Sequence, residues 1–278
     1  MPGARRRRAP ARLRPQELAD RRGNISEGLA WLGRDPEPTA GLLVRVLRLL
    51  TRFVCSGLFR LRLDATGREH LPAGGGYIVA AAVHRSWIDP LVIVYSLPVE
   101  PKPWFLGSGA TAFQRRWLEW LLRRTGGMLP VWRGGVGIEQ HVVAARAVLA
   151  AGSVFVMMPE GTIGGPPDQP TPFRGGTAII AIRAGAPIVP LAIAGAEELY
   201  LGKRMASRIL PPVTVRQLAG DAWTGSPAEG SREELAVARV VTERLEAILG
   251  EAVAAIWPPT VDPPSRPRRL RDRLTSLF

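Results

Sequence analysis

Short apolar runs alternate with segments of helical periodicity from about residue 67 to residue 250. The apolar runs are bounded by glycine, proline or polar residues and are short enough to be buried strands. Strands that alternate with helices are typical of βαβ units, so this pattern predicts one domain with a mainly parallel sheet. The predicted strands are 77–83, 104–106, 128–132, 154–158, 188–194 and 211–217. Five helices are predicted. One begins at Pro90, one runs from Ile138 to a stop at Gly152, and the others cover 111–124, 177–184 and 231–250.

Two of these strands are followed directly by polar motifs. His84 and Asp89 lie in the stretch that follows strand 77–83, and Pro159-Glu160-Gly161-Thr162 follows strand 154–158. In α/β sheets, chemistry collects at the carboxyl ends of strands. A neutral imidazole can take a proton from a substrate hydroxyl, and a carboxylate behind it fixes its tautomer and stabilises the imidazolium. No serine or cysteine nucleophile lies in an obvious motif, so the nucleophile would be the hydroxyl of the substrate.

Both motifs also have a structural interpretation. Asp89 precedes Pro90 and an apolar run, so it could cap a helix that has proline at its first position. Residues 159–162 could form an ordinary turn between a strand and a loop. On an ideal helix His84 and Asp89 would point about 140° apart, so they can meet only where the backbone bends between them. Capping and catalysis are compatible, because a carboxylate has two oxygens.

The content of cysteine and histidine limits the possible chemistry. One cysteine, Cys55, excludes an internal disulfide and any zinc cluster built on cysteine. The three histidines (His70, His84 and His141) do not have the spacing of a metal site. The sequence contains no P-loop, and Gly135-Val136-Gly137 lacks the rest of a dinucleotide fingerprint. We therefore expect no metal and no bound cofactor.

The net charge of +13 is concentrated at the two ends of the chain. Residues 1–22 contain eight arginines and two carboxylates, and residues 258–278 contain five arginines and two carboxylates. This composition predicts a flexible basic segment over 1–40 and a tail rich in proline and arginine over 251–278. Basic tails bind polyanions in general, so they leave nucleic acid and anionic lipid open as partners.

The segment 41–65 favours a membrane as that partner. Its many apolar residues are interrupted by Arg45, Arg48 and Arg52, which follow a helical i, i+3, i+7 spacing, and by Arg60. A basic stripe on an apolar helix is typical of a helix that lies in a membrane interface, although packing onto the protein's own core is the alternative. The arginines leave too short an uncharged stretch for a membrane span, which needs about 18 residues. Each basic residue near an anionic leaflet adds about 1 kcal/mol of binding, so a few allow reversible attachment.

Four blocks of this chain, in this order, resemble those of the glycerolipid acyltransferases, the family of 1-acylglycerol-3-phosphate acyltransferases. A single H-x4-D motif would be weak support, whereas four blocks at compatible intervals are specific. The likeness covers roughly residues 67–250. The blocks are His84-x4-Asp89, Gly127-Met128-Leu129-Pro130-Val131-Trp132-Arg133, Pro159-Glu160-Gly161-Thr162 and Ala186-Pro187-Ile188-Val189-Pro190, and Phe173-Arg174-Gly175-Gly176 resembles the turn before the last block.

The resemblance implies one α/β acyltransferase domain over 66–250, with a mainly parallel mixed sheet flanked by helices and preceded by the amphipathic membrane-interface helix. It also implies that a fatty acyl group moves from acyl-CoA or acyl-carrier protein to a lysolipid hydroxyl. The leading acceptor is 1-acylglycerol-3-phosphate, which would become phosphatidate. The co-substrate thioester would be the only acyl donor, and no separate cofactor is implied.

The same resemblance assigns roles to individual residues. His84 would be the general base, with Asp89 orienting its ring. Arg133 would anchor the acceptor phosphate, since a guanidinium binds phosphate through two hydrogen bonds. Glu160, Gly161, Thr162 and Arg174 would shape the acceptor site.

Two departures from the family pattern leave the acceptor open. Family members commonly carry an arginine after Glu-Gly-Thr, where this chain has Ile163, and many carry a lysine where this chain has Gly107-Ser108-Gly109. Both positions help to hold the acceptor phosphate in the family. The alternatives are another polar lipid or a glycolipid as acceptor, thioester hydrolysis without an acceptor, and a membrane-binding or nucleic-acid-binding protein that is not an enzyme.

The sequence also predicts where the protein works. The arginine-rich start is not followed by a continuous apolar stretch, so it does not have the pattern of a secretory signal. Basic ends, a reduced Cys55 and cytosolic acyl donors together predict peripheral or monotopic attachment to the cytoplasmic face of the cell membrane. Anionic lipids are then the expected membrane partners, and nucleic acid is not expected to be one.

Overall fold

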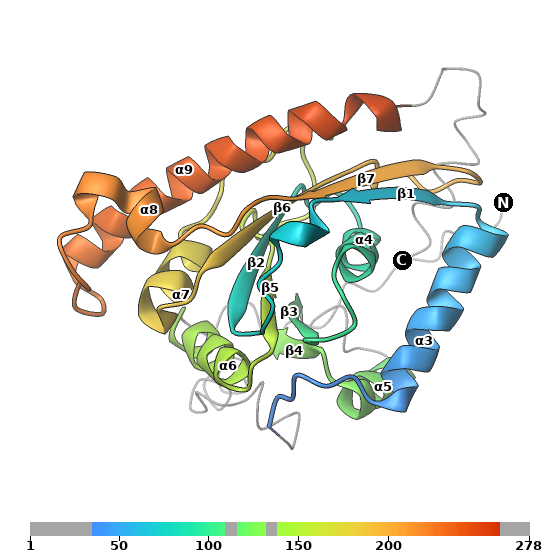
Figure 1. Ribbon diagram of the computed structural model, residues 1–278, viewed down its shortest axis with the longest axis horizontal. Coiled ribbons are helices and arrows are strands. Elements are labelled where there is room, and N and C mark those ends of the chain that lie inside the picture. Colours follow the sequence, from blue (N-terminus) through green and yellow to red (C-terminus); the bar gives the residue numbers. More distant parts are fainter. Residues whose placement is uncertain (1–34, 109–115, 132–137, 262–278) are drawn as a thin grey trace, which may run out of the picture.

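Seven strands form one mostly parallel sheet in the computed structural model, which describes residues 35–108, 116–131 and 138–261 (Figure 1). The order across the sheet is β1-β7-β6-β2-β5-β3-β4, and β6 and β7 are the antiparallel pair in it. The fold class predicted from the sequence is therefore confirmed. The strands are β1 (Arg62–Thr66), β2 (Tyr77–Ala82), β3 (Pro103–Ser108), β4 (Met128–Val131), β5 (Val154–Met157), β6 (Ile188–Ala194) and β7 (Arg204–Ile209).

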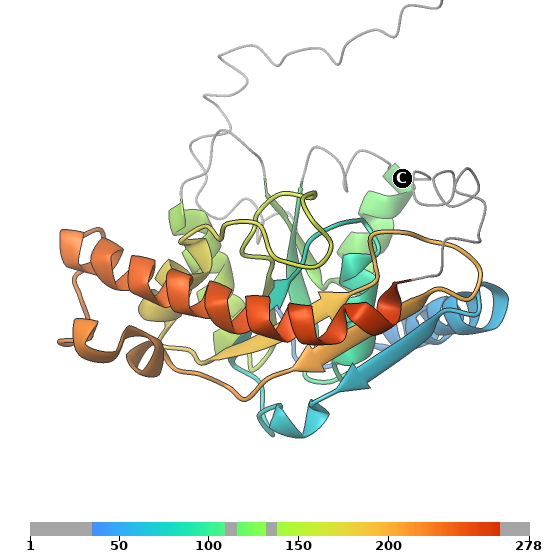
Figure 2. The same cartoon turned by 90° about the horizontal axis from the view of Figure 1, so that it is seen from above.

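Helices cover both faces of the sheet (Figures 1 and 2). Helices α6, α7 and α9 pack on one face and α4 on the other, so each face has its own apolar core. Strand β2 supplies both cores, because Ile78 and Ala80 face the first and Tyr77 and Val79 face the second. A strand buried on both sides reads as a continuous apolar run, which is why it could be predicted. The helices are α3 (Leu42–Arg52), α4 (Asp89–Ser96), α5 (Arg116–Thr125), α6 (Ile138–Ala150), α7 (Gly176–Ala184), α8 (Val215–Ala219) and α9 (Arg232–Ile256).

The strand predicted over 211–217 is wrong. The last strand, β7, lies earlier in the chain, at Arg204–Ile209, and the helix α8 begins at Val215. Thr214 starts this helix, because its hydroxyl oxygen accepts the Gln217 N–H at 3.2 Å while the Gln217 side chain accepts the Thr214 N–H. The apolar and β-branched residues of 213–215 thus suggest a strand, but a capping box overrides that preference.

Two predicted boundaries also shift. The helical part of 41–65 continues past α3 as a π-helical turn (Phe53–Leu58), and the end of that segment is β1 rather than helix. The helix predicted to start at Ser231 does so, since the Ser231 hydroxyl accepts the Glu234 N–H at 3.0 Å. It extends beyond residue 250, to Ile256.

Helix α3 is attached to the protein through its polar face. Arg45 donates to Glu100 Oε1 at 2.7 Å, and Arg48 donates to the carbonyls of Leu97 and of Pro98. No residue of α3 is buried, and the large apolar side chains of α3 and of the turn after it point to solvent. The most exposed of these side chains are Leu42, Leu49, Phe53 and Leu58, each with about two thirds or more of its area accessible. Among the described residues, no helix has the length and the apolar character that crossing a membrane requires.

Candidate active site

His84 and Asp89 meet at the junction between β2 and α4. His84 Nδ1 lies 2.8 Å from Asp89 Oδ2, because the chain bends between the end of the strand and the first turn of the helix. The same Oδ2 atom accepts the N–H groups of Arg85 at 2.6 Å and of Ser86 at 2.8 Å. Asp89 is the first residue of α4 rather than its N-cap, which is Ile88. Its carboxylate therefore holds the bend and the imidazole together.

The surroundings of this pair leave one imidazole nitrogen available. The Asp89 side chain is 1% exposed and that of His84 is 17% exposed. Because Asp89 holds the Nδ1 side, the hydrogen bond assigns the proton to Nδ1 and leaves a lone pair on Nε2. Burial raises the pKa of the Asp89 carboxyl, and the hydrogen bonds from His84, Ser86 and Arg85 oppose that rise. Those hydrogen bonds favour the ionised carboxylate, which is the form that stabilises an imidazolium.

Glu160 joins the second motif to the first. Strand β5, which ends just before it, is paired with β2, so the two strand ends lie side by side (Figure 2). Glu160 Oε1 accepts the His84 N–H at 2.8 Å, and Oε2 accepts from Arg85 at 2.6 Å and from the Thr171 hydroxyl at 2.5 Å. The residue is 2% exposed. The Glu160 carboxylate therefore points into the protein and fixes the backbone of His84 through the His84 N–H.

Arg85 is a site residue that the sequence analysis missed. Its guanidinium is buried, and besides Glu160 it donates to four carbonyl oxygens, those of His84, Gly164, Pro166 and Gln169. Three of these carbonyls belong to the Gly- and Pro-rich loop 161–172, which stands over the strand ends (Figure 2). An arginine in a polar stretch is usually solvated, so its burial could not be expected from its type. The signal in the sequence was the position of Arg85 between His84 and Asp89. The Gly- and Pro-rich loop farther along the chain has backbone carbonyls that need hydrogen-bond donors.

Three of the remaining predicted residues lie at the solvent-exposed surface. Gly161, Thr162 and Arg174 are exposed, and Gly161 has a left-handed φ of 67°. A Cβ at Gly161 would lie 3.0 Å from Arg174 Cδ and 3.2 Å from Nε, so the arginine side chain lies directly against this glycine. No carboxylate of the described part of the chain lies within 4 Å of the Arg174 guanidinium. Arg133 lies outside the described residues.

The arrangement can abstract a proton and attract an anion. His84 Nε2 is the basic atom, and Arg174 supplies a positive charge beside the Glu-Gly-Thr turn. Loop 161–172 links His84 with the Glu-Gly-Thr turn, because the loop follows that turn and its Gly164 N–H donates to the His84 carbonyl oxygen at 3.0 Å. No group of three or more histidine, cysteine or acidic side chains in the described ranges is placed to hold a metal ion.

Three comparisons with known proteins each find acyltransferases. Residues 62–194 match the family model described as Acyltransferase. The chain is 27% identical over 191 residues to 1-acyl-sn-glycerol-3-phosphate acyltransferase alpha of Homo sapiens, a match that covers 64% of each protein. The protein of the same name from Ovis aries is 26% identical over 191 residues, covering 64% of this chain and 63% of the relative. These matches thus span less than two thirds of the curated relatives.

A solved structure shares the fold. It is the crystal structure of the 1-acyl-sn-glycerophosphate (LPA) acyltransferase PlsC from Thermotoga maritima, with a TM-score of 0.55 and 18% identity. The superposition covers 77% of this chain and 79% of that one. At this identity the match bears on the fold alone.

Proposed function

Because the chain contains a domain of the acyltransferase family over residues 62–194, we propose that it transfers a fatty acyl group from a thioester to a lysolipid hydroxyl. The observation that carries this proposal is the 2.8 Å contact between His84 and Asp89 at a strand end, with Nε2 left as a base. The names of the curated relatives support a glycerolipid acceptor. The thioester, of coenzyme A or of acyl-carrier protein, is a co-substrate, and we propose no separate cofactor.

The proposed reaction proceeds by general base catalysis. His84 Nε2 takes the proton of the acceptor hydroxyl while the hydroxyl oxygen attacks the thioester carbonyl carbon, forming the C–O bond and a tetrahedral oxyanion. The oxyanion collapses, the C–S bond breaks, and the thiolate takes the proton from the imidazolium. Asp89 stabilises the imidazolium between these two transfers. Glu160 and Arg85 support the step by holding the His84 backbone and the loop above it.

We propose 1-acylglycerol-3-phosphate as the acceptor, with Arg174 and Arg133 as the anchors of its phosphate. At the position after Thr162, where family members commonly carry an arginine, this chain has the uncharged Ile163. The Arg174 side chain lies against Gly161, so it brings a guanidinium to the same turn from another part of the chain. Gly161 and Thr162 would line the acceptor site beside it, and a charge-assisted bond from arginine to phosphate stabilises binding by about 1.5–3 kcal/mol.

Thiol release from palmitoyl-CoA by the full chain in detergent micelles tests this proposal. We expect release to require lysophosphatidate. Arg174→Gln should raise the KM for lysophosphatidate by about tenfold or more, because a charge-assisted hydrogen bond is lost. The same variant should leave release with monoacylglycerol, which has no phosphate, unchanged.

Other outcomes of this assay would point to the alternatives. Release that does not depend on any added acceptor would mean thioester hydrolysis. Faster release with an uncharged acceptor than with lysophosphatidate would contradict the phosphate acceptor. No release with a coenzyme A or carrier-protein thioester would contradict an acyltransferase.

We also propose that the apolar face of α3 inserts into the cytoplasmic leaflet of the cell membrane. Arg45 and Arg48 are bound to the protein, so the outward face of the helix is apolar. A helix that shows an apolar face to solvent and a polar face to its own protein fits peripheral or monotopic attachment. The basic ends would add attraction to anionic lipids.

Replacing Leu42, Leu49 and Phe53 together with serine is expected to move the protein from the membrane to the soluble fraction. Each side chain contributes about 1.5–3 kcal/mol on burial in an apolar phase, so the loss of three lowers partitioning by about a thousandfold or more. Fractionation of lysates and flotation with phosphatidylcholine vesicles would measure it. The matched control replaces the exposed Val143, Leu235 and Val261 with serine and should stay on the membrane. Membrane binding by a folded α3 variant would contradict the proposal.

A further inference from the structure

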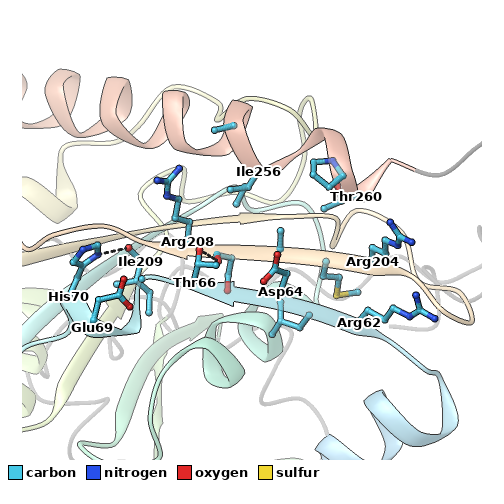
Figure 3. Close-up of a pocket in the computed structure, with 17 residues that line it drawn as sticks. Arg62, Asp64, Thr66, Glu69, His70, Arg204, Arg208, Ile209, Ile256 and Thr260 are labelled. Carbon is cyan, nitrogen blue, oxygen red and sulfur yellow. Dashed lines mark hydrogen bonds between the residues drawn. The ribbon is translucent and has the colours of Figure 1, made fainter.

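A groove of about 790 Å³ lies between β1, β7 and the end of α9, and it contains none of the candidate active-site residues (Figure 3). Its floor is the outward face of the two strands, and the last turn of α9 forms one wall. Ala206 and Ala255 leave room between these elements because their side chains are small. The charged residues that line the groove are Arg62, Asp64, Glu69, Arg204 and Arg208.

Three arginines in this groove form no ion pair with an acidic side chain in the part of the chain that the structure describes. Arg62 and Arg204 are opposite each other in the parallel register of β1 and β7, and Thr66 is opposite Arg208. Like charges directly opposite each other destabilise a sheet. Within the described residues none of the three forms an ion pair, although Asp64 lies opposite Ala206, between Arg204 and Arg208. An anion bound by Arg62 and Arg204 would remove the repulsion between these two side chains.

The groove lies on the α9 face of β1 and β7, and one end of it reaches the edge of the sheet where the segment after α3 joins β1 (Figures 1 and 3). Arg62 and Arg204 lie at the end of the groove nearest α3, and Arg208 lies farther along it (Figure 3). The chain runs from the exposed Leu58 to Arg62, whose N–H donates to the Lys203 carbonyl at 2.9 Å. The arginine pair therefore stands where the apolar helical segment returns to the sheet, at the level that lipid headgroups would occupy.

We propose that this groove binds the phosphodiester of an anionic diacyl phospholipid, a proposal that rests on the membrane attachment of α3. Guanidinium groups bind phosphate oxygens through paired hydrogen bonds. Three arginines against Asp64 and Glu69 leave one net positive charge in the groove, which matches the single negative charge of a phosphodiester. Asp64, in the middle of the floor, can accept a hydrogen bond from a hydroxyl of the headgroup, so a glycerol headgroup suits the groove.

Binding of the full chain to phosphatidylcholine vesicles with and without phosphatidylglycerol tests this site. The double variant Arg62→Gln/Arg204→Gln should lose about 30-fold in affinity for vesicles that contain phosphatidylglycerol, since each arginine near the surface adds about fivefold. Its binding to pure phosphatidylcholine and its thiol release in detergent should not change. The control Arg216→Gln/Arg232→Gln removes the same charge from exposed positions at the opposite end of α9, and it should keep the preference for phosphatidylglycerol.

Three results would overturn the headgroup site. An equal loss in the control would assign the effect to overall charge. Stabilisation of the wild-type protein against heat by inorganic phosphate alone, without a preference for phosphatidylglycerol, would assign the groove to a soluble anion. Wild-type binding to phosphatidylcholine that phosphatidylglycerol does not strengthen would leave the groove without a lipid role. A wild-type protein that fails to bind even phosphatidylcholine would instead reject the α3 attachment.

Discussion

His84→Ala is expected to lower kcat for acceptor-dependent thiol release by about 10²–10⁴-fold, the usual contribution of a positioned general base. Without the imidazole, no described side chain at the strand ends can take the acceptor proton, because Asp89 is buried behind it and Glu160 is held by Arg85. The melting temperature should change little. Asp89 keeps the N–H groups of Arg85 and Ser86 as partners, so the bend after β2 survives.

The kcat and KM of the variant, measured with palmitoyl-CoA and lysophosphatidate, check this result. His70→Ala is the matched control. His70 is also partly exposed, but it lies away from the strand ends that carry His84, and its Nδ1 contacts the Ile209 carbonyl oxygen. In detergent this control should keep the wild-type kcat. A His84→Ala protein that retains wild-type kcat would remove His84 as the base, whatever the acceptor.

Glu160→Ala is expected to lower the free energy of unfolding by about 3–5 kcal/mol, because it leaves the buried Arg85 guanidinium without its counter-ion. The pair is almost inaccessible to water, and Glu160 also satisfies the His84 N–H and the Thr171 hydroxyl. Activity should fall with stability, since the backbone of His84 loses its support. Urea unfolding followed by the fluorescence of the chain's tryptophans would measure the change.

Two further variants separate positioning from stability. Arg85→Leu/Glu160→Leu removes both charges and should regain much of the stability, since replacing a buried pair with apolar residues is often neutral or better. It should not regain activity, because loop 161–172 and the His84 N–H still lack their partners. Glu229→Ala breaks the exposed pair with Arg146 and should cost less than about 1 kcal/mol. An equal cost for Glu160→Ala and Glu229→Ala would contradict the buried pair's role.

The sequence predicted those strands whose side chains are buried on both faces. Strands β2, β5 and β6 are continuous apolar runs, and they were found with small errors at their ends. Strand β7 was missed because Arg204 and Arg208 face outward on it, and the apolar residues after it suggested a strand that is in fact the start of α8. An outward-facing polar side chain weakens the apolar pattern of a strand.

The site was predictable where a motif carried it and not where packing decided it. The spacing of His84 and Asp89 required a bend between them, and the structure places that bend between β2 and α4. The inward turn of Glu160 depends on Arg85, whose burial is set by carbonyls of a loop more than 70 residues away. Likewise, the spacing of the α3 arginines predicts one basic stripe, but Glu100 binds Arg45 and the carbonyls of Leu97 and Pro98 bind Arg48.

Helix α4 connects the exposed helix α3 with the candidate active site. It begins with Asp89 and ends next to Leu97 and Pro98, whose carbonyls hold Arg48 of α3. At about 1.5 Å per residue, its eight residues form a rod of about 12 Å. The carbonyls that hold Arg48 of α3 and the carboxylate that bonds the His84 imidazole therefore lie at the two ends of one two-turn helix. The exposed helix and the His84–Asp89 pair are thus joined through a single short element of the fold.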